Sequence, residues 1–412
     1  MRESSANVLV IGAGAAGLTA AIFAARKGAR VLVLESSRRG GKKIVVSGGG
    51  RCNVLPSRVD PARYVTDSSP RTLRRMLLSW PLAEQRAFFE DDLGVPLALE
   101  EETGKLFPVS NRATDVRDAL VGAALSAGAR FEFETTVTDL ARVAGSGWRV
   151  TASGGRAFAA PRVVLATGGL SVPKTGSDGF GLRVARGLGH AMHPTYPALA
   201  PLLAEGAPHK PLAGLAVRAE VHAPAGKRGV RTTGGFLFTH RGYSGPAVLD
   251  VSHLTALAAA GGHPQPVRVS WDGREASAWD ADLRASGPGL VVSDLRQRLP
   301  ARLADALLAE ADVPASRVRA ELRKDERKRL VRALTEYDLP WTGDEGYKKA
   351  EVTGGGVALG EVDPTTMESR RAGGLYLCGE VLDAFGPIGG YNFMWAWSTG
   401  RAAGTASASA CA

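Results

Sequence analysis

One segment near the N-terminus constrains the fold more than any other. A short aliphatic run, Val8–Ile11, leads directly into Gly12-Ala-Gly-Ala-Ala-Gly17, and a helix-forming stretch up to Lys27 follows. A second aliphatic run, Val31–Leu34, then ends in Glu35. A strand, a G-x-G-x-x-G turn, a helix and a second strand that ends in an acid together make the βαβ unit of a dinucleotide-binding fold. The sequence therefore predicts an α/β protein with a Rossmann-type domain.

Each small or acidic residue of this unit has its own expected role. Gly12 makes the tight turn, Gly14 lets the backbone approach a pyrophosphate, and Gly17 lets the helix pack closely on the strand. The N-terminus of the helix offers unpaired N–H groups to the phosphates. Glu35 would accept hydrogen bonds from a ribose diol and would repel a 2′-phosphate, so FAD or NAD is favoured over NADP.

The net charge and the cysteine content indicate what the protein binds and in which cellular compartment it is found. The net charge is +10, from 51 Lys and Arg against 41 Asp and Glu. A basic protein is more often one with an anionic partner, such as a nucleotide, a nucleic acid or an acidic metabolite. The three cysteines, at positions 52, 378 and 411, are too scattered for a disulfide framework or a zinc site. We therefore expect a reducing, cytoplasmic location.

The apolar stretch Val8–Ala25 is the one segment that could be mistaken for a signal peptide or a membrane anchor. Three glycines interrupt its first half, no basic region precedes it, and a further aliphatic run follows within a few residues. These features favour the strand, turn and helix over the membrane alternative. We expect a soluble protein with no membrane partner.

A second glycine-rich run follows at residues 40–53. It interleaves Lys42, Lys43, Arg51 and Cys52 with aliphatic residues, which is unusual for a flexible linker. Beside a dinucleotide site, its triple glycine predicts backbone that lies flat against a planar ring. Cys52 itself is expected to be a small buried residue and not a nucleophile.

Hydrophobic spacing predicts the remaining elements of the first half. Residues 73–93 and 114–127 have helical spacing. Residues 131–137 alternate like a strand, and 148–152 are expected to form its antiparallel neighbour. A buried strand at 162–166 runs into Thr167-Gly168-Gly169, which returns the chain to the nucleotide edge of the sheet.

The second half of the sequence first loses the pattern of buried strands followed by glycines and then regains it near the C-terminus. Prolines and short alternating stretches predict a mixed β part at about 189–292, and a helical part follows at about 293–344. A buried strand at 374–378 then runs into Gly379-Glu380, and a closing helix opens within 389–401. We therefore expect one domain built from residues 1–188 and 345–412, with a substrate domain inserted at 189–344.

These motifs together resemble the bacterial BaiN-like family of NAD(P)/FAD-dependent oxidoreductases, often labelled aminoacetone-oxidase-family flavoproteins. The matching segments, spread over residues 8–404, are Gly12–Gly17 with Glu35, Ser47–Asn53, Ala166–Gly169, Thr175–Gly179, Leu188–His190, Leu237–Pro246, Glu351–Val357, Thr366–Ser369, Gly379–Asp383 and Gly389–Asn392. Two departures lie beside the expected flavin ring: Ala384-Phe385 makes one loop apolar, and Val54-Leu55-Pro56 replaces the Thr-Asn step that commonly follows Asn53. For this reason the identity of the substrate cannot be inherited from the resemblance.

The resemblance implies a tightly bound FAD in a two-segment domain with an insert. The adenine would meet the backbone at Val137, and the ribityl chain and isoalloxazine would meet Ser47–Gly49, Asp383 and Gly390–Asn392. A helix that opens near Gly390 would direct its positive end toward the reduced ring. The full set of expected cofactor contacts is Gly12, Ala13, Gly14, Ala16, Gly17, Glu35, Ser36, Gly41, Lys42, Ser47, Gly48, Gly49, Val137, Thr167, Gly168, Gly169, Gly379, Glu380, Asp383, Gly390, Tyr391 and Asn392.

Four residues are catalytic candidates. Tyr391 could donate a proton or a hydrogen bond at the ring. Arg51 could bind an anionic substrate or a carbonyl oxygen, or could instead pair with a nearby acid. His240 and Tyr243 are expected to cover the ring from the insert, since imidazole titrates near neutrality, although His240 could equally be a turn histidine. No residues have metal-ligand spacing, and no Ser-His-Asp arrangement can be argued from the sequence.

The expected activity is hydride exchange between FAD and a small organic substrate, as NAD(P)H-linked reduction of an activated C=C bond or its reverse. The alternatives are an oxygen-using amine oxidase and an RNA-binding flavoprotein that acts on tRNA. No second strand–G-x-G-x-x-G–helix unit is visible, so NAD(P)H would dock transiently or another donor would supply electrons. The basic run Arg317–Arg332 is expected to be a solvated helix face, and nucleic acid is the less favoured partner. The oligomeric state stays open.

Overall fold

The computed structural model describes residues 6–143, 145, 147–206, 209–224, 229–261, 265–285 and 287–409, so Cys411 lies outside the described residues. The chain forms two compact units, Met1–Tyr196 with Val352–Ala412 and Pro197–Glu351. Each unit has its own hydrophobic core. The domain limits expected from the sequence, 188/189 and 344/345, stay predictions.

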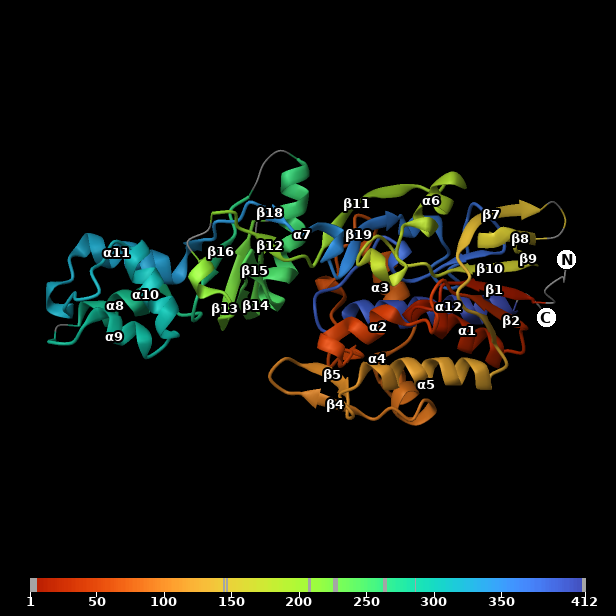
Figure 1. Cartoon of the computed structure of the whole chain (residues 1–412), viewed down its shortest axis with the longest axis horizontal. Helices are drawn as coiled ribbons and strands as arrows, with labels where there is room; N and C mark the ends of the chain where they lie inside the picture. Colours follow the sequence, from red (N-terminus) through yellow and green to blue (C-terminus); the bar gives the residue numbers. More distant parts are fainter. Residues whose placement is uncertain are drawn as a thin grey trace. The chain divides into compact units, whose positions relative to one another are not determined.

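The first unit is built on a five-stranded parallel sheet (Figure 1). The strand order is β20 (Leu375–Leu377), β10 (Arg162–Leu165), β1 (Val8–Ile11), β2 (Val31–Leu34) and β6 (Arg130–Glu132). Every residue of the central strand β1 and of its neighbour β2 is buried, as expected for strands of a parallel sheet that is covered on both faces. The predicted Rossmann-type fold is confirmed.

Helices α1 (Ala15–Arg26), α5 (Ala113–Ser126) and α12 (Tyr391–Ser409) gather on one side of this sheet (Figure 1). The ends of the sequence meet here, because α1 and α12 pack directly against each other. A Cβ atom on Gly400 or Gly404 would lie within 2.4 Å of a backbone oxygen of α1. Only glycine therefore allows this close helix crossing.

Smaller elements complete the first unit. Three small sheets have the orders β7-β8-β9, β3-β5-β4 and β11-β19. Their strands are β7 (Val137–Val143), β8 (Gly147–Ala152), β9 (Ala157–Ala160), β3 (Leu55–Pro56), β5 (Lys105–Pro108), β4 (Leu97–Glu100), β11 (Met192–Ala198) and β19 (Val352–Val357), and the remaining helices are α2 (Lys42–Val46), α3 (Pro70–Leu77), α4 (Leu82–Ala87) and α6 (Phe180–Gly187).

Two sequence-based expectations for this unit are wrong. The helix expected at 73–93 is divided into α3, α4 and a π-helical turn at Phe88–Asp92, because Pro81 has no N–H to continue a helix. The strand expected at 131–137 ends at Glu132, where it completes the parallel sheet, and a turn with Glu134 at φ 53° follows. The antiparallel neighbour of β8 is therefore β7.

The second unit contains a seven-stranded sheet of order β17-β16-β13-β14-β15-β12-β18. Its strands are β17 (Tyr337–Asp338), β16 (Arg268–Ser270), β13 (Ala216–Ala223), β14 (Val230–Phe238), β15 (Gly242–Ser244), β12 (Leu202–Leu203) and β18 (Gly343–Asp344), and its helices are α7 (Pro246–Ala260), α8 (Ala276–Arg284), α9 (Val291–Arg296), α10 (Ala301–Glu310) and α11 (Lys324–Thr335). Phe236, Phe238 and Trp271 are fully or almost fully buried in its core.

Two expectations for this second unit also need correction. The part expected to be β structure, 189–292, contains the helices α7 and α8 as well as strands. The basic run Arg317–Arg332 is not one helix, because α11 begins only at Lys324. Among the described residues of the whole chain, no helix combines the length and the hydropathy that crossing a membrane requires.

Candidate dinucleotide-binding site

The three motif glycines differ in what surrounds them. Gly12 has φ 99°, and a Cβ there would lie 2.6 Å from the Ala166 carbonyl oxygen. A Cβ on Gly17 would lie 1.9 Å from the Gly12 oxygen. A Cβ on Gly14 would meet nothing within 4 Å. Gly12 and Gly17 therefore permit close packing, whereas Gly14 borders open space at the N-terminus of α1, where a phosphate can approach.

Glu35 is held in place at the end of β2. Its carboxylate accepts hydrogen bonds from Ala13 N at 2.7 Å and Ser37 N at 2.7 Å, and the residue is 8% exposed. The Glu35 carbonyl oxygen accepts from Thr135 N at 2.9 Å, two residues before Val137. Ser36 Oγ lies 3.4 Å from the same carboxylate. The acid thus joins the glycine turn to the segment expected to meet adenine.

The loop at residues 47–53 has an unusual backbone. Gly48, Gly49 and Gly50 have φ of 55°, 67° and 86°, a left-handed run that favours glycine. A Cβ on Gly49 or Gly50 would meet nothing within 4 Å, so this backbone borders open space. Asn53 Oδ1 is buried beside Gly48 and has no hydrogen-bond partner among the described residues. These features fit a loop that receives a flat ligand.

Cys52 lies in the same loop but is not a nucleophile. Its side chain is fully buried, and burial raises the pKa of the thiol to about 12, against the opposing hydrogen bond with Ser47. The thiol therefore stays protonated near neutral pH, and only the thiolate reacts readily. This agrees with its expected role as a small buried residue.

The start of α12 packs against the backbone that follows the loop 47–53. A Cβ on Gly390 would lie 2.5 Å from the Leu55 carbonyl carbon. Asn392 accepts from Gly386 N at 2.8 Å and donates to Gly386 O at 2.9 Å, so it clamps the apolar loop that departs from the family pattern. Asn392 therefore positions this loop, and both its side-chain oxygen and its side-chain nitrogen are hydrogen-bonded to Gly386.

Tyr391 is held from two sides. Its hydroxyl oxygen accepts from Arg63 Nη1 at 2.7 Å, and its carbonyl oxygen accepts from the Tyr64 hydroxyl at 2.7 Å. Burial raises the pKa of Tyr64 well above its ordinary value, so Tyr64 is a permanent donor in this contact. No sequence pattern pointed to Arg63 or Tyr64, because they lie more than 300 residues away from Tyr391 along the chain.

A partly buried network joins Lys43 to Glu380. Lys43 Nζ lies 2.6 Å from Glu380 Oε2 and 2.6 Å from Ser171 Oγ, and Glu380 Oε1 accepts from Ser171 and Thr353. Burial on its own would raise the pKa of Glu380. The Lys43 ammonium and the hydrogen bonds outweigh burial and hold this pKa below its ordinary value. The pair fixes α2 against the segment after β20.

Other expected cofactor residues lie at the same edge of the sheet. Gly168 and Gly379 have φ of 72° and 76°, and a Cβ on Gly169 would collide with Thr353. Gly41 N donates to Ala13 O at 2.8 Å. Thr167 Oγ1 is buried beside Gly181 and has no partner among the described residues, so its hydroxyl faces α6.

Asp383 is the centre of a second polar cluster. Its Oδ2 accepts from Ser68 N at 2.9 Å, Ser68 Oγ at 2.7 Å and Thr66 Oγ1 at 2.9 Å. Burial raises the pKa of Asp383 in spite of these bonds. His193 Nε2 lies 3.3 Å from Ser68 Oγ and 3.6 Å from Asp383 Oδ2. The structure thus groups a Ser, a His and an Asp that the sequence could not connect, although the serine bonds the acid directly.

The remaining catalytic candidates have partners or lie in the second unit. Arg51 Nη1 pairs with Glu100 at 3.0 Å, and its guanidinium lies 3.9 Å from the Phe107 ring centroid. His240 is exposed in the second unit. Tyr243 is fully buried in the core of that unit, 3.0 Å from His209 Nδ1. The expectation that His240 and Tyr243 cover the ring stays a prediction.

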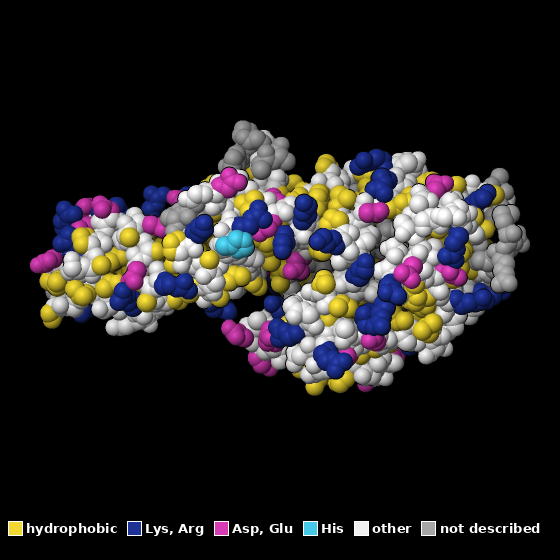
Figure 2. Space-filling model, in the orientation of Figure 1, with side chains coloured by type: hydrophobic (Ala, Val, Ile, Leu, Met, Phe, Trp, Pro, Cys, Tyr) yellow, Lys and Arg dark blue, Asp and Glu magenta, His cyan; other side chains and the backbone are white. Residues whose placement is uncertain are grey.

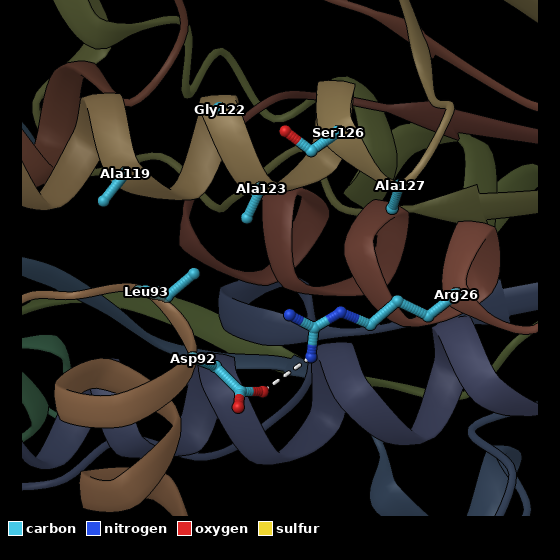
Figure 3. Close-up of a pocket in the computed structure, with 8 residues that line it drawn as sticks. All are labelled: Arg26, Asp92, Leu93, Ala119, Gly122, Ala123, Ser126 and Ala127. Atoms are coloured by element: carbon cyan, nitrogen blue, oxygen red, sulfur yellow. Dashed lines mark hydrogen bonds and ion pairs between the residues drawn. The ribbon is translucent and has the colours of Figure 1, made fainter.

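A separate cavity of about 480 Å³ does not belong to this site. It is lined by Arg26, Asp92 and Leu93 and by small residues of α5, with an ion pair of 2.7 Å between Arg26 and Asp92 (Figure 3). Arg26 is the last residue of α1, which runs 12 residues away from the glycine turn. At 1.5 Å per residue the cavity is about 18 Å from the phosphate end of that helix.

The geometry fits a dinucleotide with a flat ring. Open space borders Gly14, Gly49 and Gly50, the acid Glu35 lies beside the glycine turn, and the long helix α12 begins at the ring end. These features, on a parallel sheet with glycine turns after its strands β1 and β10, are those of a flavoenzyme of the Rossmann type.

Comparison with known proteins extends this conclusion. The model of the HI0933-like protein Rossmann domain matches residues 6–406, so the chain belongs to this family and is placed among the FAD-dependent oxidoreductases. The 3-dehydro-bile acid delta(4,6)-reductase of Clostridium scindens is 35% identical over 407 residues, which are 97% of this chain and 98% of that protein. The ribosomal RNA dihydrouridine synthase of Escherichia coli is 33% identical over 401 residues, 95% of this chain and 96% of that protein.

The fold also has a counterpart among solved structures. The 3-ketosteroid-delta4-(5alpha)-dehydrogenase of Rhodococcus jostii RHA1 superimposes with a TM-score of 0.51 and 19% identity, over 98% of this chain and 96% of that chain. At this level of identity the similarity establishes the fold alone.

Proposed function

We propose that this protein uses FAD to reduce a C=C bond that is conjugated to a carbonyl group. The observation that carries the proposal is its 35% identity, along almost the whole chain, to a delta(4,6)-reductase of a 3-dehydro bile acid. A 3-keto group conjugated to such double bonds activates them toward hydride. The RNA relative is named for making dihydrouridine, which differs from uridine by two hydrogens across a bond conjugated to a carbonyl. The two relatives share this bond type and not the substrate.

The residues at the carboxyl edge of the sheet would hold the cofactor. The glycine turn would bind the pyrophosphate, Glu35 the adenosine ribose, and the loop 47–53 with the start of α12 the ring. When bound and reduced, FAD supplies the hydride. Tyr391 would hydrogen-bond the substrate carbonyl, and His240 is the stronger insert candidate because Tyr243 is fully buried.

Electrons would come from NAD(P)H that docks transiently. The sequence offers one strand–G-x-G-x-x-G–helix unit, and the structure uses that unit to form the edge assigned to FAD. A nicotinamide donor would therefore share the substrate side of the ring and leave before the substrate binds.

Anaerobic turnover tests this proposal against the amine-oxidase alternative. The holoenzyme is mixed, without oxygen, with NADH or NADPH and a panel of conjugated ketones, and in a parallel series, also without oxygen, with primary amines. We expect consumption of the reduced nicotinamide that depends on the ketone. Reduction of the flavin by an amine, with no reaction of any conjugated ketone, would contradict the proposal and favour the oxidase.

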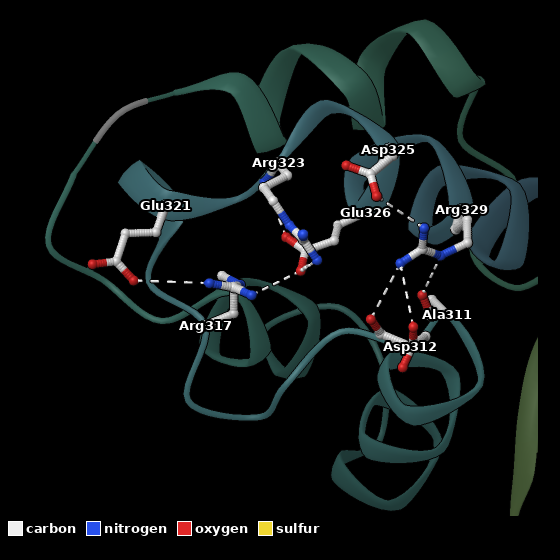
Figure 4. A network of polar contacts seen from close by, with 8 residues as sticks. All are labelled: Ala311, Asp312, Arg317, Glu321, Arg323, Asp325, Glu326 and Arg329. Carbon is white, nitrogen blue, oxygen red and sulfur yellow. Dashed lines mark hydrogen bonds and ion pairs between the residues drawn. The ribbon is translucent and has the colours of Figure 1, made fainter.

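A uracil base in RNA is a second candidate substrate, favoured by the identity to the dihydrouridine synthase. The basic run Arg317–Arg332 does not add support. Arg317 and Arg323 pair with the buried Glu326, and Arg329 pairs with Asp325 (Figure 4). On the part of the second unit that Figure 2 shows, basic side chains are interspersed with acidic ones. Mass spectrometry of ribosomal RNA from a deletion strain would show a missing dihydrouridine if this candidate is correct.

A further inference from the structure

Arg63 and Tyr391 make a pair that the sequence did not connect. The Arg63 guanidinium donates from Nη1 to the Tyr391 hydroxyl oxygen at 2.7 Å and lies 4.9 Å from the centroid of the same ring. Arg63 is exposed, and no ion pair joins it to a carboxylate within the described ranges. Guanidinium has five N–H donors, so several stay available beside the phenol.

The Tyr391 hydroxyl group is available as a hydrogen-bond donor. Its oxygen already accepts from Arg63, and within the described part of the chain the Tyr391 O–H finds no acceptor. Tyr64 anchors the backbone of Tyr391 through a bond of 2.7 Å to its carbonyl oxygen. Tyr391 is also the first residue of the 19-residue helix α12, whose positive end lies there. The first residue of α12 thus combines a phenol, the guanidinium that it accepts from and a helix N-terminus.

We propose that Arg63 and Tyr391 form a site for an oxyanion, namely the oxygen of the enolate formed from a conjugated carbonyl substrate. This inference rests on the proposed function and names the group that the site recognises. Preorganised donors contribute most where charge develops during the reaction. Arg63 is, on this account, a second oxyanion donor that also orients Tyr391.

Reduction of the substrate adds one hydride and one proton across its C=C bond. Bound FAD, reduced by NAD(P)H, would supply a hydride, whose two electrons form the new C–H bond at the β-carbon. The C=C π bond breaks and its electron pair shifts, so that negative charge develops on the carbonyl oxygen. The Tyr391 O–H and an Arg63 N–H stabilise that oxygen. The α-carbon then takes a proton from water, and the C=O bond is restored.

A phenolate is a stable mimic of an enolate oxygen, so binding can be measured without turnover. The oxidised holoenzyme is titrated with para-chlorophenol, and the flavin absorbance reports the bound phenolate. We expect Tyr391→Phe and Arg63→Met to weaken binding about tenfold or more, since each substitution removes a hydrogen bond to a charged oxygen. Arg63→Lys should retain part of the affinity. Arg71→Met, at an exposed arginine of α3, is the matched control and should bind normally.

Single-turnover reduction of cyclohexenone by the reduced holoenzyme supplies the second readout. Arg63→Met should slow flavin reoxidation strongly in the wild-type background but much less in a Tyr391→Phe background, because the two donors share one oxygen. Unchanged phenolate binding in both single variants, or no binding by the wild-type protein, would overturn the oxyanion site. Phenolate binding through the pair, without reduction of any conjugated ketone, would instead overturn the proposed function and leave the site standing.

Discussion

The glycines of the first βαβ unit fall into two kinds, and substitution should separate them. Gly14 has φ −80° and open space on its Cβ side, so Gly14→Ala should fold normally and lose FAD, because the methyl group would occupy the place of a phosphate. Gly17→Ala should lower the melting temperature of the apoprotein by about 5 °C, since overpacking costs about 1–3 kcal/mol. Thermal melts and flavin content measure both effects. Full flavin retention in Gly14→Ala would contradict the phosphate assignment.

Glu35 should determine whether the adenosine half is retained. Glu35→Arg replaces an acceptor for the ribose diol by a donor, and it also removes the bonds to Ala13 N and Ser37 N. We expect FAD affinity to fall on the order of 10–100-fold. Equilibrium dialysis and chromatography of the released flavin measure the loss, and FAD, not FMN, should be recovered from the wild type. Glu101→Arg, at an exposed acid, is the control. Normal flavin content in Glu35→Arg would place the ribose elsewhere.

Local sequence explains the glycine turn and Glu35, because their roles depend on neighbours within one βαβ unit. It could not supply the partners of Lys43, Asp383 or Tyr391. Glu380 lies 337 residues from Lys43, and Ser68 lies 315 residues from Asp383. Such contacts depend on the tertiary fold and have no spacing pattern that a single sequence displays.

Among the secondary-structure elements, the parallel strands β1, β2 and β20 were predicted well because each is a short apolar run with a glycine or an acid close to one of its ends. The errors occurred where one apolar pattern continued through a break. Leu73–Leu93 keeps helical spacing across Pro81, and the apolar alternation at 131–137 continues through the turn at Glu134. In both cases the backbone ended the element although the hydrophobic pattern continued: Pro81 lacks an N–H for the helix, and Glu134 has a positive φ that a strand does not have.

Helix α11 depends on a buried acid at its N-terminus. The Glu326 side chain is 0% exposed and lies 2.9 Å from Arg323 and 2.8 Å from Arg317 (Figure 4). The hydrogen bond from Arg323 is the main cause that lowers the pKa of Glu326 to about 2. The basic run thus serves chiefly to neutralise acids within the second unit.

This depressed pKa predicts a specific pH dependence. A carboxyl whose pKa is lower in the folded state stabilises the fold above its unfolded pKa, near 4.5, and loses this effect as the pH falls toward 2. Glu326→Gln should therefore lower the melting temperature by a constant amount between pH 7 and about 5. The difference from the wild type should shrink below that range. Calorimetry measures it, and a difference that grows as the pH falls would contradict the assignment.

For the molecule as a whole, the sequence predicted the Rossmann-type sheet, the family and the edge that collects the glycine loops. The sheet follows from the apolar runs of the βαβ unit, and the edge follows from the rule that ligands bind at the carboxyl ends of parallel strands. The family was identified from the resemblance of the motifs. The internal build of the second unit was predicted less well, because α7 and α8 lie among its strands. The expectation that the second unit covers the flavin ring stays a prediction. The choice between a small ketone and a uracil base as the substrate also stays open to experiment.

The central claim is that the protein transfers a hydride from reduced FAD to a conjugated C=C bond. The most direct measurement is a single anaerobic turnover, in which dithionite-free reduced holoenzyme receives one equivalent of a conjugated steroid ketone and the product is analysed by mass spectrometry. The account predicts that the flavin is reoxidised in proportion to the ketone and that the product gains two hydrogens at the double bond, with its carbonyl intact. A flavin that stays reduced, or a product reduced at the carbonyl, would contradict it.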